Sequence, residues 1–202
     1  MKFAITLLII LLNFLCSASE EKTIGYYLLK RPYICEGKVV KSSGLKIQIQ
    51  ISHWLKENKK KKNIVVWHNF ALSEKKNRKR EWEKRKEKSF IFILGGRNTE
   101  TNKWILRESM AFEIINDSIF VTKMFFKGLT IKEESNQLKL KKELVKNGYR
   151  ISVFNFEKLV SIIYNLFIID ENRGCVKLSD QLPILDPFQK IVIYDLLKYK
   201  CE

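Results

Sequence analysis

GLKIQIQISHWLK, residues 44–56, decides the expected fold, because its apolar side chains recur at every second position. One face of an extended chain would carry Leu45, Ile47, Ile49, Ile51, His53 and Leu55, and the other would carry Lys46, Gln48, Gln50, Ser52, Trp54 and Lys56. A period of two is typical of a half-buried antiparallel strand. We therefore expect a sheet with His53 on its buried side.

Further strands are expected on both sides of this segment. Residues 33–40 would form its hairpin partner, and β-branched or aromatic runs follow at 63–72 and at 90–94, the last ended by Gly95-Gly96. Two more hairpins are predicted, 104–115 with 119–131 and 138–146 with 149–156. The second would turn at Asn147-Gly148, residues that tolerate the positive φ of a type I′ turn. Only residues 156–167 show helical periodicity. The predicted fold is mostly β, an antiparallel β-sandwich with at most one helix.

The first 18 residues have the pattern of a secretory signal peptide. Lys2 precedes an apolar run that ends at Leu15, and small residues follow at Cys16-Ser17-Ala18. The run has about 13 residues, which is short of the roughly 20 that a membrane-spanning helix needs. Cleavage would leave a secreted, extracellular protein that begins near Ser19, and an uncleaved anchor is the alternative.

The composition indicates a globular chain with unevenly distributed charge. Of the 202 residues, 46% are hydrophobic and 12% aromatic, which supports a real core and excludes a disordered chain. The formal net charge is +16, and residues 56–88 hold 14 Lys or Arg against five Glu. More than half of the excess charge therefore lies in one short segment.

Within that segment, residues 73–89 contain Trp82 as their single large apolar side chain, which favours an exposed insertion between two strands. The functional alternative is a patch for a polyanion such as a sulfated glycan, an anionic lipid or nucleic acid. Nucleic acid would require exposed aromatic residues among the charges, and only Trp82 is present. The residues of this predicted patch are Lys59, Lys60, Lys61, Lys62, Lys75, Lys76, Arg78, Lys79, Arg80, Lys84, Arg85 and Lys86.

Cysteine usage agrees with export. Once Cys16 is removed with the signal peptide, Cys35, Cys175 and Cys201 allow one disulfide in any of three pairings. The chain has no CxxC motif and no His-rich tract, so we expect neither a metal site nor a cofactor. Asn116-Asp117-Ser118 is an N-glycosylation sequon in a predicted turn, where Asn116 would be exposed.

No catalytic motif is recognisable in the sequence. His53 and His68 each adjoin a tryptophan in a predicted strand, which favours histidines of a core or an interface. A secreted hydrolase that pairs Cys35 with one of these histidines remains an alternative.

Two segments resemble the nematode transthyretin-like secreted proteins. They are residues 27–50, YLLKRPYICEGKVVKSSGLKIQIQ, and residues 170–201, DENRGCVKLSDQLPILDPFQKIVIYDLLKYKC. The positions that carry the resemblance are Cys35, Gly37, Lys38, Gly174, Leu178, Ser179, Asp186, Pro187, Ile193, Tyr194 and Cys201. The resemblance implies a transthyretin or Ig-like β-sandwich, secretion, no enzyme activity and a binding or bridging role at cell surfaces. It also implies a disulfide between Cys35 and Cys201, which would leave Cys175 for a disulfide dimer.

The expected organisation follows from these observations. Residues 1–18 would be the signal peptide, 19–127 a β-sandwich with the basic insertion at 73–89, and 128–202 a second β-rich half or a continuation of the same sandwich. The expected function is non-enzymatic binding or bridging of an extracellular protein or cell-surface ligand.

Overall fold

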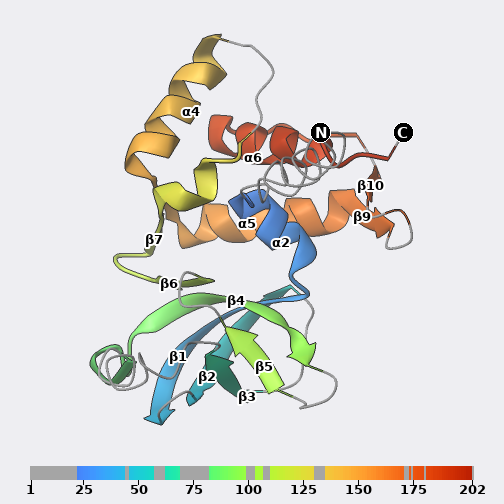
Figure 1. Ribbon diagram of the computed structural model, residues 1–202. Helices are drawn as coiled ribbons and strands as arrows, with labels where there is room; N and C mark the ends of the chain where they lie inside the picture. The colour runs from blue at the N-terminus through green and yellow to red at the C-terminus, as the bar shows by residue number, and fades with distance from the viewer. Residues whose placement is uncertain are drawn as a thin grey trace, which may run out of the picture.

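A computed structural model places a β-barrel beneath a layer of helices (Figure 1). It describes residues 22–43, 46–56, 62–68, 82–98, 103–106, 110–129, 135–170, 173, 175–179 and 181–201. The expected signal peptide and most of the predicted basic patch lie outside these ranges. None of the helices in the described ranges is both long enough and apolar enough to cross a membrane.

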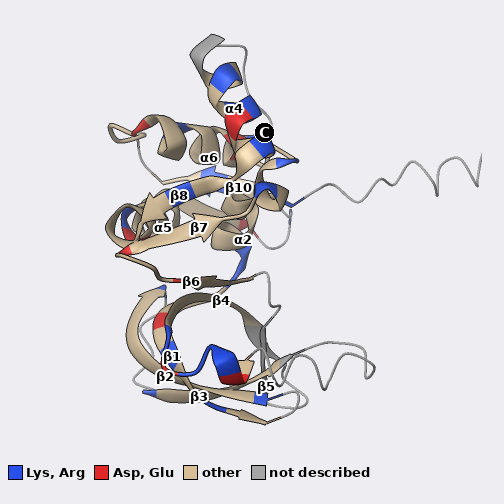
Figure 2. Ribbon diagram, turned by 90° about the vertical axis from the view of Figure 1, so that its left-hand side faces the viewer, with Lys and Arg blue, Asp and Glu red and all other residues tan. Residues whose placement is uncertain are grey.

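The barrel closes because one strand pairs on both of its edges. Its strands are β1 (Tyr33–Ser43), β2 (Lys46–Lys56), β3 (Asn63–His68), β4 (Ser89–Asn98) and β5 (Lys103–Leu106). Strand β1 is antiparallel to β2 and to β4, β3 is parallel to β5, and β5 is antiparallel to β4. The ring therefore runs β1-β2-β3-β5-β4 and back to β1, and Figure 2 shows it nearly end-on. Strand β6 (Ala111–Glu113) pairs with the first part of β4.

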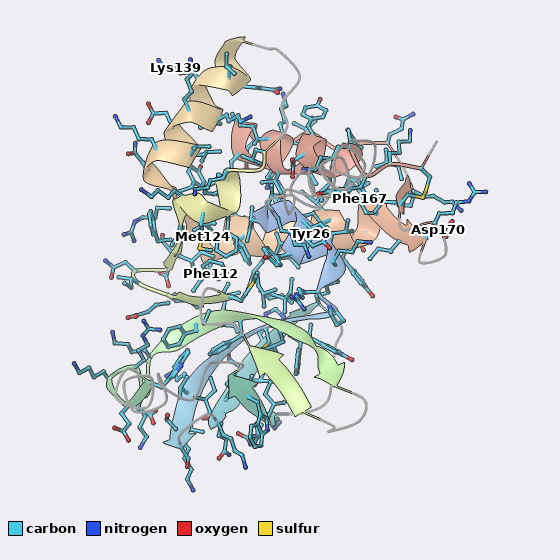
Figure 3. The ribbon with its side chains drawn as sticks, viewed as in Figure 1. Tyr26, Phe112, Met124, Lys139, Phe167 and Asp170 are labelled. Atoms are coloured by element: carbon cyan, nitrogen blue, oxygen red, sulfur yellow. A yellow bond between two sulfur atoms is a disulfide. The ribbon has the colours of Figure 1, made fainter. Side chains whose placement is uncertain are left out.

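The side chains of β2 and β4 explain where the core lies. Ile47, Ile49 and Ile51 of β2 point into the barrel, as their alternation predicts. Residues 90–94 of β4 are buried without alternation, because β4 separates the barrel from the helices above it (Figure 1). On the barrel side, Phe90 lies 5.7 Å from the ring of the fully buried Trp82. On the other side, Phe112 of β6 lies between the barrel and the helical layer (Figure 3). The centre of its ring is 5.6 Å from that of Phe125 and 6.4 Å from that of Phe156.

Glycines at two places in the barrel permit the curvature that closure requires. The β1–β2 register shifts between Glu36 and Gly37, and a Cβ at Gly37 would lie 2.5 Å from the Gln50 carbonyl oxygen. Strand β4 has a register shift between Gly95 and Arg97, where it leaves β6 and begins to pair with β5. The Gly95-Gly96 pair thus bends a strand that it was expected to end, since bulges and glycines increase local curvature.

The helical layer includes elements from both ends of the described chain. It contains α2 (Ile24–Lys30), η3 (Lys123–Phe126), α4 (Ser135–Asn147), α5 (Val153–Leu166) and α6 (Pro187–Leu197). Two short strand pairs belong to it, β7 (Ser118–Val121) with β8 (Tyr149–Ser152) and β9 (Phe167–Asp170) with β10 (Cys175–Leu178). Side-chain caps start three of the helices, at Thr23 for α2, Ser152 for α5 and Asp186 for α6.

A buried polar cluster joins α2 to α6. The Thr23 hydroxyl donates a hydrogen bond of 2.6 Å to Asp195, which is fully buried. Lys198 forms an ion pair of 3.1 Å with the other carboxylate oxygen of Asp195 and donates to the Gly128 carbonyl. Burial alone would lower the pKa of Lys198, but the Asp195 carboxylate and hydrogen bonds with Asp195 and Tyr199 raise it above its ordinary value. Asp195 therefore has the partners that a buried carboxylate requires.

The expected β-sandwich with at most one helix is wrong. The described residues after position 128 form three helices and only short strands, so they are not a β-rich half. Residues 138–146, expected as a strand, lie within α4, and Gly148 with φ 75° ends this helix instead of forming a hairpin turn. Residues 187–197 are also helical because Asp186 and Gln189 form a capping box with Pro187 in the first turn. The helix expected at 156–167 is confirmed, and as α5 it spans Val153–Leu166.

The hairpin expected from residues 104–115 and 119–131 forms only at its turn. Asn116 and Asp117 do form a tight turn, with φ of 49° and 53°, and Ile115 bridges Ser118 across it. Beyond that bridge the two arms separate, because β6 pairs with β4 whereas β7 pairs with β8. The turn therefore passes the chain from the barrel into the helical layer.

The disulfide joins Cys175 to Cys201, so the expected Cys35–Cys201 pairing is wrong. Cys35 is a fully buried residue of β1, opposite Phe92 of β4. Cys201 lies beside β10 instead, where its backbone N–H donates to Val176 at 2.9 Å. Because the Cys175 sulfur is already bonded within the chain, it cannot link two copies of the protein as expected.

Substitution of Gly37 by Ala should destabilise the barrel, because the new Cβ would collide with the backbone of β2. We expect a loss of about 1 to 3 kcal/mol in the free energy of unfolding, measured by chemical denaturation. Lys38→Ala, at the exposed neighbouring position of β1, is the matched control and should change stability little. Equal losses for both variants would contradict the close packing of β1 on β2.

Removal of the disulfide by Cys201→Ser should lower the free energy of unfolding by roughly 2 to 4 kcal/mol, since the bond closes a loop with a separation of 26 residues. The double variant Cys175→Ser, Cys201→Ser should lose no more than the single variant. Non-reducing peptide mapping of the unmodified protein identifies the pairing directly. A peptide that links Cys35 to Cys201 would contradict the structure.

Candidate functional site

The outer surface of β1, β2 and β3 presents a continuous row of polar side chains. We call it the barrel face and define it by Lys38, Lys41, Lys46, Gln48, Gln50, Asn63, Val65 and Trp67, whose side chains are exposed or half-buried. The register places Gln50 beside both Lys38 and Asn63, and Gln48 beside both Lys41 and Val65. Side chains from three strands thus lie in rows across one surface.

The barrel face is rich in hydrogen-bond donors and contains no carboxylate. Among the described residues between positions 38 and 67, none is Asp or Glu. Lys46 lies opposite Trp67, and its ammonium nitrogen is 4.1 Å from the centre of a ring of that side chain, a cation–π distance. The amides of Gln48, Gln50 and Asn63 can each donate and accept hydrogen bonds. Such a surface suits a ligand that is both anionic and rich in hydroxyl groups.

The described part of the predicted patch adjoins this face. Lys62 directly precedes β3, whereas Lys84, Arg85 and Lys86 lie in the connection that leads into β4. The Glu87 backbone N–H donates to the Val39 carbonyl of β1 at 3.1 Å, so this connection ends beside Lys38. The other predicted patch residues, Lys59, Lys60, Lys61, Lys75, Lys76, Arg78, Lys79 and Arg80, lie outside the described residues.

Trp82 does not have the exposed position that sequence reasoning gave it. Its side chain is fully buried, lies 5.7 Å from Phe90 and is covered by the Arg85 guanidinium at 5.3 Å. It therefore anchors the end of the basic segment to the barrel core. It cannot serve as a stacking platform for a nucleic-acid base.

The position of His53 does not support its pairing with Cys35 in an active site. His53, expected on the buried side, has a side chain 61% exposed that faces Glu157 at 3.7 Å, because the β1–β2 register shifts near Glu36. Cys35 is opposite Trp54, not His53. Burial, with a smaller contribution from Glu36, raises the pKa of the Cys35 thiol to about 12. The reactive thiolate is thus disfavoured. His68 ends β3, and its side chain lies outside the described part.

Two other features of the described residues bear on expected sites. Asn116 is exposed in its turn, as a glycan acceptor would be, and its glycosylation stays a prediction. Asp170, Cys175 and Cys201 lie close enough to share a metal ion, but both sulfurs are bonded to each other and Asp170 pairs with Lys177 at 3.1 Å. A disulfide offers no thiolate ligand.

Comparison with protein-family models found no match, and comparisons with curated proteins and with solved structures found none either. The resemblance to transthyretin-like proteins therefore stays a prediction, although the sandwich that it implied is not the fold observed.

Sequence reasoning placed Lys46, Gln48 and Gln50 on a polar strand face but gave that face no function. The missing partner was Trp67, which the register brings opposite Lys46 although they are 21 positions apart. The run of Lys, Gln and Asn at alternate positions of β2 and at the start of β3, without Asp or Glu, was the signal that could have identified the face.

Cys35 should resist alkylation in the folded protein. Because burial raises its pKa from 9.0 to about 12, the stabilising preference for the neutral thiol is present below pH 9 and lost as the pH rises toward 12. We expect position-resolved peptide mass spectrometry to find little modification of Cys35 by iodoacetamide at neutral pH, and full modification after denaturation. Rapid native modification of Cys35 would reopen the hydrolase alternative.

Proposed function

We propose that this protein is a secreted, non-enzymatic binding protein that holds an extended anionic polysaccharide, such as a sulfated glycan, on its barrel face. The observation that carries the proposal is the barrel face on β1, β2 and β3, whose defining residues include three lysines, three amides and Trp67 and no Asp or Glu. Ammonium groups pair with sulfate or carboxylate groups, and amides bind sugar hydroxyls. The basic segment that leads into β4 adds charge beside the same face.

The architecture supports this assignment without deciding it. A five-stranded Greek-key barrel is the arrangement of the oligonucleotide/oligosaccharide-binding fold, in which the second and third strands present the ligand face. The barrel face occupies the corresponding strands here. Because folds host many functions, the residues on the face must carry the argument.

The barrel face has too few exposed aromatic rings for nucleic acid, and this favours a glycan as the ligand. Non-specific binding of single strands relies on several exposed rings on which successive bases stack. On the barrel face Trp67 is half-buried and already paired with Lys46. The exposed aromatic residues Phe120, Phe154, Tyr164 and Tyr194 belong to the helical layer instead.

Export is supported by the Cys175–Cys201 disulfide and by the signal-peptide pattern of residues 1–18. Disulfides persist mainly in oxidising compartments, where sulfated glycans of cell surfaces and matrices are also found. Glycan binding at a surface gives a physical basis for the bridging role expected from the sequence.

The triple variant Lys38→Gln, Lys41→Gln, Lys46→Gln should lose most of its affinity for heparin and show a weaker dependence of binding on salt, because three charge contacts are removed. Calorimetry or affinity chromatography at several salt concentrations measures both effects. The matched control is Lys139→Gln, Lys142→Gln, Lys146→Gln on the exposed side of α4, which changes the net charge equally.

Equal weakening by the two triple variants would mean that only net charge matters, and would refute the barrel face as the site. Tighter binding of single-stranded DNA than of heparin at the same salt would replace the glycan with nucleic acid. Neutralisation of Lys75, Lys76, Arg78, Lys79 and Arg80 measures separately what the basic segment contributes.

A further inference from the structure

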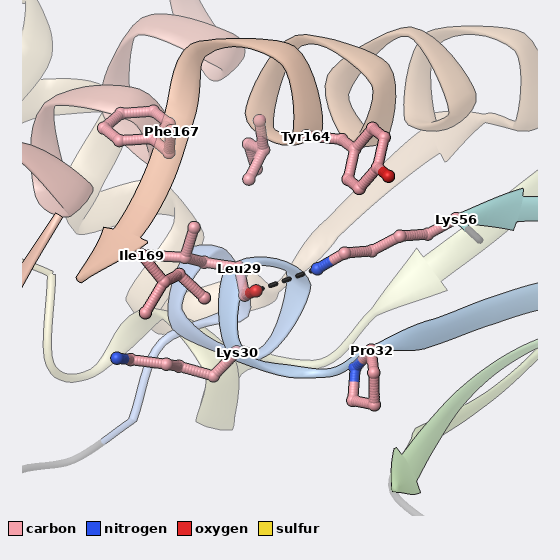
Figure 4. Close-up of a pocket in the computed structure, with 8 residues that line it drawn as sticks. Leu29, Lys30, Pro32, Lys56, Tyr164, Phe167 and Ile169 are labelled. Carbon is pink, nitrogen blue, oxygen red and sulfur yellow. Dashed lines mark hydrogen bonds between the residues drawn. The ribbon is translucent and has the colours of Figure 1, made fainter. Parts of the chain in front are cut away.

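A pocket of about 300 Å³ lies where the end of β2 meets the helical layer, between α2, α5 and β9 (Figure 4). Its apolar lining consists of Leu29, Pro32, Ile163, Phe167 and Ile169. These residues come from α2, the connection to β1, α5 and β9. The pocket is therefore built from segments that the fold brings together, and it lies away from the outer strand surface that forms the barrel face.

Most of the apolar lining is held firmly by the core. Leu29 is 3% exposed, Ile163 1% and Phe167 5%. Phe167 and Ile169 alternate along β9, so their side chains leave the same face of that strand. Because close-packed neighbours fix these side chains, the shape of the pocket is largely formed before a ligand arrives.

The ammonium group of Lys56 is engaged by the protein itself. Lys56 is 9% exposed, and its ammonium nitrogen donates to the carbonyls of Leu28 and Leu29 at 2.9 and 2.8 Å. These carbonyls belong to the last turn of α2, where backbone acceptors have no partner within the helix. An anion in the pocket would have to compete with them for Lys56.

The remaining polar side chains of the pocket do not form a charged site either. Figure 4 shows the Lys30 side chain extending away from the Lys56 ammonium group. None of the residues that line the pocket is Asp or Glu. The lining therefore has neither two cations that meet at one point nor a carboxylate for a cation. A charged ligand would lose hydration here without a matched partner, which favours a neutral one.

The volume and the border of the pocket limit the ligand further. An engineered cavity of roughly 150 Å³ lined by Leu, Ile and Phe binds benzene. The pocket beside β9 has a similar apolar lining and a volume of about 300 Å³. Tyr164 is 53% exposed and lies at its solvent-facing border. A single hydroxyl of a ligand could therefore remain near water or the Tyr164 phenol while the hydrocarbon part is buried.

We propose that this pocket binds a neutral, mainly hydrocarbon molecule about twice the size of benzene, such as a medium-chain aliphatic alcohol. Its hydrocarbon part lies against Leu29, Ile163 and Phe167, and its hydroxyl faces solvent beside Tyr164. The proposal does not depend on glycan binding at the barrel face.

Octanol is the probe for the test, with the full chain followed by amide resonances in an NMR titration. We expect saturable shifts at Ile163, Tyr164 and Ile169. Octanoate and octylammonium, which have the same chain with a charged end, should each bind about tenfold more weakly, because the charge has no matched partner in the pocket. Lys30→Gln should leave the affinity for octanol unchanged, since the Lys30 charge does not take part in binding.

Two neighbouring positions of β9 provide a matched pair of variants. Ile169→Trp, at a half-buried position of the lining, should abolish octanol binding by filling the space while the amide spectrum retains its dispersion. Ile168→Trp is the control, because Ile168 is 57% exposed and on the other face of the strand, and it should bind octanol normally. Ile169→Phe, a smaller change, should weaken binding several-fold and tests the cavity if the tryptophan variant does not fold.

The proposal is overturned if octanol causes no saturable shifts at the pocket, or if octanoate or octylammonium binds as tightly as octanol. Equal affinity for octanol in the folded variants at positions 168 and 169 would also overturn it, because binding would then lie elsewhere.

Discussion

The pairing of β1 on both of its edges is the constraint on which the rest of the structure depends. The same residues, 34–38, bond to β2 on one side and to β4 on the other, and this closes the barrel. Strand β1 lies so close to β2 that a Cβ atom at Gly37 would be 2.5 Å from the Gln50 carbonyl oxygen. A closed barrel then turns the outer side chains of β1, β2 and β3 toward solvent as one polar face. It also fixes the end of β2, from which Lys56 reaches α2.

Sequence patterns identified the strands well and the helices poorly, for a physical reason that particular residues show. The alternation of Ile47, Ile49 and Ile51 is unambiguous, since only an extended chain buries every second residue. In α4 the run Leu138-Lys-Leu140 alternates as well, but its continuation through Leu144 follows a helical spacing. In α6 the apolar run 191–193 is buried on all sides, which removes any periodicity. In the sequence, the capping residue Asp186 was the feature that could have predicted helix α6.

The two candidate sites differ in how much of each could be predicted from the sequence. Three members of the barrel face stand within five positions of each other in β2, so only their pairing with Trp67 needed the structure. The pocket combines Leu29, Lys56, Ile163 and Ile169, which are brought together by contacts of α5 with α2, β2 and β9. No local pattern encodes such contacts. The buried position of Lys56 reverses the solvent-facing place that strict alternation had given it.

The hydrogen bond between Thr23 and Asp195 spans 172 positions and has a consequence for biogenesis. The barrel strands occupy one continuous stretch, so they can close while later residues are still being synthesised. The hydroxyl that caps α2 finds its carboxylate partner only after Asp195 has been synthesised. The first helix of the described residues therefore completes its polar contact later than the barrel can close.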